Sequence, residues 1–167
     1  MHLLKAPRMT RPADTTAYAS GDLVANSTTA GSVTPLAFGD GPGVIRVRRF
    51  LMRTSNSTVT NKNYTLYLFA SRPTVTNGDN GAFAVTDANG GSSIFAIFGS
   101  TAAMSYGGGS FQMFYPLDSA ATAVNGWADQ LAPGQFYGLL KVNAAYTPTS
   151  AETYDLAAEI AMDVNAT

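Results

Sequence analysis

The sequence contains no cysteine and a single histidine, His2. Without cysteine there is no disulfide, no thiolate nucleophile and no Cys-based metal site. One histidine in the first residues cannot supply a Ser-His-Asp triad, a Cys-His pair or a His-based zinc site. Most hydrolase mechanisms are thereby excluded, and we expect a protein without enzyme activity, cofactor or metal.

Charged residues are scarce as well, at 13% of the 167 residues, which is about half the usual share of roughly 25%. A neutral, hydroxyl-rich surface suits strand faces and permanent contacts with neighbouring subunits, where bare charges are costly to desolvate. No run of residues approaches the roughly 18 to 20 apolar residues of a membrane span. Residues 1–11 also lack the apolar core of a secretory signal. We therefore expect a soluble protein, made in a cytoplasm, with no membrane partner.

The few charges are unevenly distributed. Residues 1–53 hold seven bases and three acids, a net charge of +4, whereas residues 54–167 hold three bases and eight acids, a net charge of −5. The two halves could face each other or oppositely charged neighbours, and ion pairing between strands of one domain explains the asymmetry equally well. Nucleic-acid binding is disfavoured, because no set of aromatic residues that could stack on nucleobases accompanies these basic residues. The seven bases are candidates for assembly contacts: Lys5, Arg8, Arg11, Arg46, Arg48, Arg49 and Arg53.

The clearest secondary-structure signal lies near the end of the sequence. Apolar residues alternate with other residues over Thr153–Val164, a period of two that predicts a half-buried strand. Intrinsic propensity favours a helix here, and Thr149 with Glu152 has the spacing of a helix capping box. A helix, however, would scatter the six apolar side chains around its circumference. The periodicity therefore decides for a strand.

Similar patterns predict further strands. In Val44–Thr54 the apolar phase changes at Arg49, and a β-bulge near Arg48 and Arg49 would produce that change. The connection Ser119–Leu131 is interpreted as a long loop with one short turn around Trp127. Glycine-rich and proline-containing turns separate the strand candidates. The other strand candidates are Tyr64–Ser71, Ile94–Phe98, Phe111–Leu117 and Gln135–Asn143, with weaker ones at Leu23–Asn26 and Val33–Phe38.

Short strands separated by turns predict an all-β fold, an antiparallel β-sandwich over residues 13–167. Residues 1–12 are basic, are interrupted by Pro7 and Pro12 and lack strand alternation. We interpret them as a short N-terminal arm, with a frayed terminus as the alternative.

Four groups of residues are candidates for chemistry or binding. Glu152, Asp155 and Glu159 are the nearest approach to a glycosidase carboxylate pair, but on a strand Asp155 and Glu159 share a solvated polar face with Asp163. Residues 77–89 offer oxygen ligands for calcium without the spacing of an EF-hand, and a tight Asx-type turn explains them too. Gly107–Gly109 lacks the context of a phosphate-binding loop and is interpreted as a flexible connection. An exposed aromatic platform for carbohydrate would use Tyr106, Phe114, Tyr115, Trp127 and Tyr146.

Several segments together resemble a known kind of protein. They are RPADTTAYASGD at residues 11–22, VIRVRR at 44–49, NGDNGAF at 77–83, YGLL at 137–140 and AAYTPTS at 144–150, followed by the final strand. In this order they are similar to small structural proteins of tailed bacteriophages, in particular the jelly-roll cement or decoration proteins on the capsid surface. The resemblance covers roughly residues 10–163.

The resemblance implies a jelly-roll-like sandwich that forms homo-oligomers, commonly trimers, over junctions between capsomers. It implies the major capsid protein as a partner, a place in the virion and stabilisation of the head shell, with residues 1–12 reaching a neighbouring subunit or the shell. A carbohydrate- or receptor-binding module of a tail fibre or tail protein is the alternative function.

Overall fold

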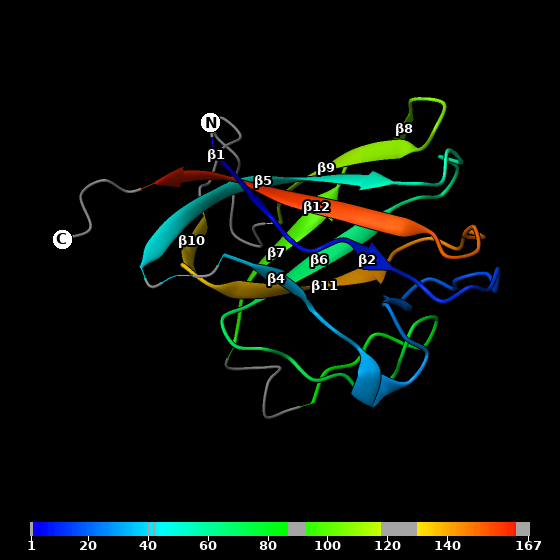
Figure 1. The fold of residues 1–167 in the computed structure, drawn as a ribbon, viewed down its shortest axis with the longest axis horizontal. Coiled ribbons are helices and arrows are strands. Elements are labelled where there is room, and N and C mark those ends of the chain that lie inside the picture. Colours follow the sequence, from blue (N-terminus) through cyan, green and yellow to red (C-terminus); the bar gives the residue numbers. More distant parts are fainter. Residues whose placement is uncertain (1, 40, 42, 87–92, 118–129, 163–167) are drawn as a thin grey trace.

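The computed structural model describes residues 2–39, 41, 43–86, 93–117 and 130–162. These residues form an all-β, sandwich-like fold built from one antiparallel sheet of 12 strands that curls over on itself (Figure 1). The main path through the sheet runs β1-β12-β5-β9-β7-β6-β11-β3. No helix within these ranges is long and apolar enough to cross a bilayer. The predicted fold class is confirmed.

The strands are short except for β5 and β12, and one short 3-10 helix, η1, lies between β3 and β4. In chain order the elements are β1 (His2–Lys5), β2 (Met9–Thr10), β3 (Leu23–Val24), η1 (Ala30–Ser32), β4 (Leu36–Phe38), β5 (Val44–Thr54), β6 (Tyr64–Phe69), β7 (Ile94–Ser100), β8 (Met104–Ser105), β9 (Ser110–Pro116), β10 (Gln130–Pro133), β11 (Phe136–Val142) and β12 (Thr153–Met162).

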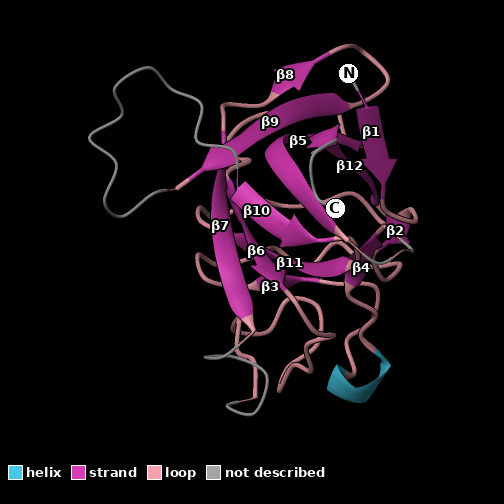
Figure 2. Cartoon of the chain, turned by 90° about the vertical axis from the view of Figure 1, so that its left-hand side faces the viewer, coloured by secondary structure: helices cyan, strands magenta, loops and turns pink. Residues whose placement is uncertain are grey.

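Strand β5 lies at the centre of the curled sheet, because it is long enough to pair with three other strands. One edge of β5 pairs with β12 along its length, while the other edge pairs first with β10 and then with β9. From β9 the sheet continues through β7 and β6 to β11. Because the sheet curls, these strands form the second side of the sandwich-like fold (Figure 2). Glu159 lies opposite Arg49 but the next residue, Ile160, lies opposite Val47, so Arg48 is the extra residue of a bulge. The predicted bulge is confirmed.

The core lies between the two sides of the curled sheet and is rich in phenylalanine. Phe50 of β5 meets Phe98 of β7 edge to face, with ring centroids 5.0 Å apart, and both are fully buried. Phe38 of β4 stacks on Phe136 of β11 at 5.0 Å. Each buried aromatic ring removes a large apolar area from water, so this cluster supplies much of the free energy that holds the two sides together.

The strand predicted at the end of the sequence is also confirmed as β12, and residues 163–167 lie outside the described residues. Tyr154, Leu156, Ala158 and Ile160 point inward and are buried. One of the two capping-box contacts forms: the Thr149 N–H donates to Glu152 Oε2 at 3.3 Å, whereas the Glu152 N–H donates to the Thr149 carbonyl at 3.2 Å and not to its side chain. They close the tight turn before β12 and no helix follows, because the alternating apolar residues favour the sheet.

The N-terminal segment differs from the arm or frayed terminus expected there. Strand β1 pairs antiparallel with β12, and β2 pairs with the beginning of β12. Met9 and Arg11 are buried. The prediction that residues 1–12 form no strand is therefore wrong. Strand β1 forms one edge of the sheet by pairing with β12 of the same chain.

Of the predicted connections, Gly107–Gly109 forms the turn between β8 and β9, closed by the Tyr106 N–H donating to the Gly109 carbonyl at 3.0 Å. A Cβ on Gly109 would lie 2.2 Å from the Thr54 carbonyl oxygen, so the close approach of β5 requires glycine there. The connection predicted over Ser119–Leu131 lies outside the described residues up to residue 129, and its end, Gln130–Leu131, begins β10.

Candidate functional site

A group of buried polar side chains, the Arg11 cluster, joins two distant parts of the chain at one end of the sheet. It consists of Arg11, Tyr18 and Asp79, whose side chains are almost inaccessible to solvent. Arg11 Nη2 donates to Asp79 Oδ2 at 3.0 Å, and the Tyr18 hydroxyl donates to Asp79 Oδ1 at 2.6 Å. Arg11 Nε also donates to the Tyr18 hydroxyl at 3.1 Å. The three residues therefore form a closed triangle of hydrogen bonds.

The loop that holds Asp79 is a tight turn, as expected, but the Asn77 side chain takes part as a donor and not as the acceptor of an Asx-type turn. The Asn77 amide donates to the Ala82 carbonyl, and the Gly81 N–H donates to the Gly78 carbonyl. Gly78 is required, because a Cβ there would lie 2.1 Å from the Thr28 main chain. This close packing aims the Asp79 carboxylate at the interior rather than at solvent.

The Asp79 carboxylate is occupied by protein donors. Besides Tyr18 and Arg11, the Ala25 N–H donates to Oδ1 at 2.8 Å. Burial raises the pKa of the Asp79 carboxyl, while the hydrogen bonds from Tyr18 and Ala25 and the charge of Arg11 act in the opposite direction. A guanidinium at 3.0 Å takes the position that a cation would need. Asp79 therefore does not act as a calcium ligand here, and Asp87 and Asn89 lie outside the described residues.

A second buried group, the Lys62 cluster, surrounds a lysine in the connection between β5 and β6. The Lys62 and Glu152 side chains are both fully buried, and Nζ lies 2.8 Å from Glu152 Oε1. Nζ also donates to the Thr54 hydroxyl at 2.9 Å and to the Asn56 carbonyl at 3.1 Å. Burial lowers the pKa of the Lys62 ammonium, and the Glu152 carboxylate opposes that shift.

Three buried tyrosines lie between the two clusters. Tyr146 and Tyr154 share a hydrogen bond between their hydroxyls at 2.7 Å, and Tyr64 packs edge to face against both rings. The Tyr146 ring also lies 5.3 Å from the Tyr18 ring and 5.7 Å from Lys62 Nζ. The polar interior is thus continuous from Arg11 to Glu152, and the sequence patterns did not predict that these side chains are buried together.

The three carboxylates considered for a glycosidase are not brought together. Glu152 belongs to the buried Lys62 cluster, whereas Asp155 and Glu159 lie on the opposite, outward face of β12. Asp155 accepts two hydrogen bonds from Arg8, at 2.7 and 2.8 Å, and stays partly exposed. Glu159 pairs with Arg49 and is 9% exposed. The prediction that Glu159 lies on a solvated polar face is therefore wrong. Asp163 lies outside the described residues.

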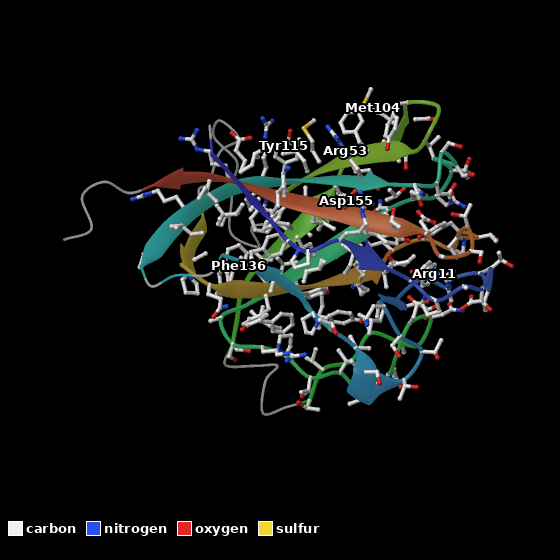
Figure 3. All side chains as sticks on the ribbon, viewed as in Figure 1. Arg11, Arg53, Met104, Tyr115, Phe136 and Asp155 are labelled. Carbon is white, nitrogen blue, oxygen red and sulfur yellow. The ribbon has the colours of Figure 1, made fainter. Side chains whose placement is uncertain are left out.

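The outward side of β1, β12, β5, β9 and β8, here called the outer face, carries the remaining candidate residues. The register places them in rows across the sheet: Lys5 beside Ala157, Leu51 and Met113, and Asp155 beside Arg53, Phe111 and Met104. Figure 3 shows Met104, Tyr115 and Arg53 along the upper edge of the molecule, away from Phe136 in the interior. The outer face therefore has an apolar centre bordered by charges.

Large apolar side chains on this face are exposed to solvent. Met104 is 59% exposed and Leu3 is 41% exposed, and Tyr106 beside β8 is 56% exposed. Leu51, Phe111 and Met113 are half-buried between them. A sheet face with exposed large apolar residues is typical of a surface that another molecule covers.

Six of the seven assembly candidates lie on or beside the outer face. Lys5, Arg46, Arg48 and Arg53 are exposed, and Arg8 and Arg49 form the ion pairs with Asp155 and Glu159. Arg11 is 2% exposed and serves the interior, so it is not an accessible contact, which corrects its place among the candidates. Three ion pairs join the basic half of the chain to the acidic half, as ordinary ion pairing within one domain would do. They are Arg8–Asp155, Arg49–Glu159 and Arg11–Asp79.

The aromatic platform proposed for carbohydrate does not form from the described residues. Phe114 is fully buried and Tyr146 is 6% exposed, because both point into the core from β9 and the loop before β12. Tyr106 is exposed and Tyr115 is half-buried, and Trp127 lies outside the described residues. The prediction of one shared platform is therefore wrong for Phe114 and Tyr146.

Within the described ranges, no three His, Asp or Glu side chains gather so that they could hold a metal ion. Comparison with protein-family models, with curated proteins and with solved structures finds no match to this chain. The outer face and the two buried clusters are thus the features from which a function can be argued.

Proposed function

We propose that this protein is a structural subunit of a bacteriophage virion, a capsid cement or decoration protein. In this proposal it binds the major capsid protein and other copies of itself, as a trimer, on the surface of the head. It stabilises the shell by bridging capsomers and acts by assembly rather than by catalysis.

The outer face is the observation that carries the proposal. Exposed Met104, Tyr106 and Leu3 surround a half-buried apolar centre, and covering them would release water from apolar surface. The centres of stable interfaces are depleted of charge and enriched in aromatic, methionine and arginine side chains. The composition of this face, with Met104, Phe111 and Arg53 in one row, matches that pattern.

The charges on the face support a partner with an acidic surface. Lys5 and Arg53 are exposed there and add to the positive charge of Arg46 and Arg48, whereas the whole chain has a net charge of −1. Complementary charge steers association and fixes the register of an interface more than it adds affinity. That the partner is a phage shell rests on the sequence resemblance, and the neutral remainder of the surface is compatible with close packing of copies.

Binding to isolated heads tests the proposal. Expanded heads that lack this protein should take it up in co-sedimentation, and the double change Met104→Asp with Arg53→Glu should weaken that uptake by at least about tenfold, because it puts unpaired acids into the interface. Val59→Asp is the matched control, since Val59 is 38% exposed in the β5–β6 connection, outside the outer face. Its uptake should equal that of the wild type. Wild-type protein that does not sediment with heads, or face variants that bind as well as the control, would count against the proposal.

A further inference from the structure

The carboxylate of Glu152 holds an amine and an amide side by side in the interior. Its Oε1 accepts from Lys62 Nζ at 2.8 Å, and its Oε2 accepts from the Asn56 side-chain nitrogen, Nδ2, at 3.1 Å. Nζ also lies 3.1 Å from the main-chain oxygen of the same Asn56. Lys62 and Asn56 are 2% and 3% exposed and Glu152 is 0% exposed, so water has little access to the group.

We propose that Lys62 and Asn56 form an intramolecular isopeptide bond, with Glu152 transferring the proton between them. The product is a secondary amide that joins Lys62 Nζ to Asn56 Cγ, and one molecule of ammonia leaves. The reaction happens once in each folded chain and needs no cofactor, oxidant or second substrate.

The proton and bond changes balance with the three side chains alone. Glu152 Oε1 first accepts a proton from the Lys62 ammonium, which leaves a neutral amine with a lone pair. The C–N bond forms between Nζ and Asn56 Cγ, and the bond between Cγ and Nδ2 breaks. One amine proton reaches the departing nitrogen through Glu152, so that ammonia leaves and takes up the first proton as ammonium, which restores the carboxylate.

The surroundings favour each part of this reaction. Burial lowers the pKa of Lys62, which raises the fraction of neutral, nucleophilic amine. The Thr58 N–H donates to Asn56 Oδ1 at 2.9 Å and so stabilises negative charge that develops on this oxygen during the attack. The hydrogen bond between Asn56 Nδ2 and Glu152 Oε2 places the leaving group beside its proton donor. The proposal is independent of the capsid function and holds for any role of the chain.

The consequence of the bond is a covalently closed loop. Residues 57–61, between the two linked side chains, are exposed and connect the long strand β5 to β6. Exposed connections are the preferred sites of local opening and proteolysis. A link between Asn56 and Lys62 would hold this connection closed even when the surrounding side chains loosen.

The mass of the intact protein tests the inference directly. Purified wild-type protein should be lighter than its sequence mass by one ammonia, after allowance for removal of Met1. Trypsin under denaturing conditions should not cut after Lys62, because an acylated lysine is not a substrate, and the fragment containing both residues should carry the mass loss. Glu152→Gln and Lys62→Met should both restore the full sequence mass.

Two controls separate this bond from other events. Succinimide formation at an Asn-Gly pair such as Asn77-Gly78 also removes ammonia, but it leaves cleavage after Lys62 intact, and mild base hydrolyses the succinimide to aspartate or isoaspartate, which abolishes the mass loss. Lys141→Arg changes a lysine outside the Lys62 cluster and should keep the mass loss. Because wild-type mass decides the question, poor folding of a variant does not weaken the test. Wild-type protein at its full sequence mass, with normal cleavage after Lys62, would overturn the inference.

Discussion

Replacing Asp79 with alanine should lower the free energy of unfolding by about 3 to 5 kcal/mol, the usual cost of removing one partner of a buried ion pair. Arg11 would remain buried with only Asp14, which is partly exposed, as an acidic neighbour. The Tyr18 hydroxyl and the Ala25 N–H would also lose their acceptor. Chemical denaturation monitored by circular dichroism measures the change.

The exposed pair Arg8–Asp155 provides the matched control. Its geometry is as good as that of the buried pair, with Nε 2.7 Å from the carboxylate, but both side chains are largely accessible to solvent. Asp155→Ala should therefore leave the free energy of unfolding close to that of the wild type. Asp79→Asn should fall between the two, since it keeps the shape and part of the hydrogen bonding but removes the charge. Equal losses for Asp79→Ala and Asp155→Ala would show that the Arg11 cluster does not stabilise the fold.

Alkaline pH should destabilise the protein steeply. Burial, the largest cause in each case, raises the pKa of Tyr18, Tyr64, Tyr146 and Tyr154 above the ordinary value of about 10. The folded state therefore keeps protons that the unfolded state releases, so this contribution to stability is complete below pH of about 10 and declines as the pH rises above it. Each tyrosine contributes a slope of about 1.4 kcal/mol per pH unit, and four together contribute about 5.5 kcal/mol per unit.

Tyrosinate absorbance measured alongside circular dichroism checks this prediction. The four buried tyrosines should ionise only as the protein unfolds, within roughly two pH units above 10, given a typical total stability of about 5 to 15 kcal/mol. Tyr64→Phe should reduce the slope by about a quarter. It should leave stability at neutral pH equal or higher, because the Tyr64 hydroxyl is buried without a hydrogen-bond partner among the described residues. Ionisation of all the tyrosines in a protein that stays folded would contradict the prediction.

The strands with the clearest periodicity could be predicted from the sequence. In β12 and β5 the alternation extends over ten or more residues, and even the bulge at Arg48 was visible as a change of apolar phase. The two-residue strands β2 and β8 were missed because two residues show no period, whereas the equally short β3 lies within the predicted strand Leu23–Asn26. β1 was missed because only its pairing with β12, far away in the sequence, makes its four residues a strand.

The buried clusters could not be predicted, for a different physical reason. Arg, Lys, Asp and Glu are almost always exposed unless paired, and the partner that allows burial lies far along the chain. Arg11 and Asp79 are 68 positions apart, and Lys62 and Glu152 are 90 positions apart. The tight turn around Asp79 and the spacing of Thr149 and Glu152 were the only local signals. Each had a simpler interpretation: the residues around Asp79 as a surface turn, and the spacing of Thr149 and Glu152 as a helix cap.

The location of this chain in an intact particle tests the central proposal most directly. The proposal predicts that a cryo-EM map of phage heads assembled with this chain shows its curled sheet on the outside of the shell. Copies should lie around junctions between capsomers, with the outer face, including Met104 and Arg53, covered by a neighbouring subunit. A map in which the chain is absent from the virion, or in which Met104 and Arg53 face solvent in every copy, would contradict the proposal.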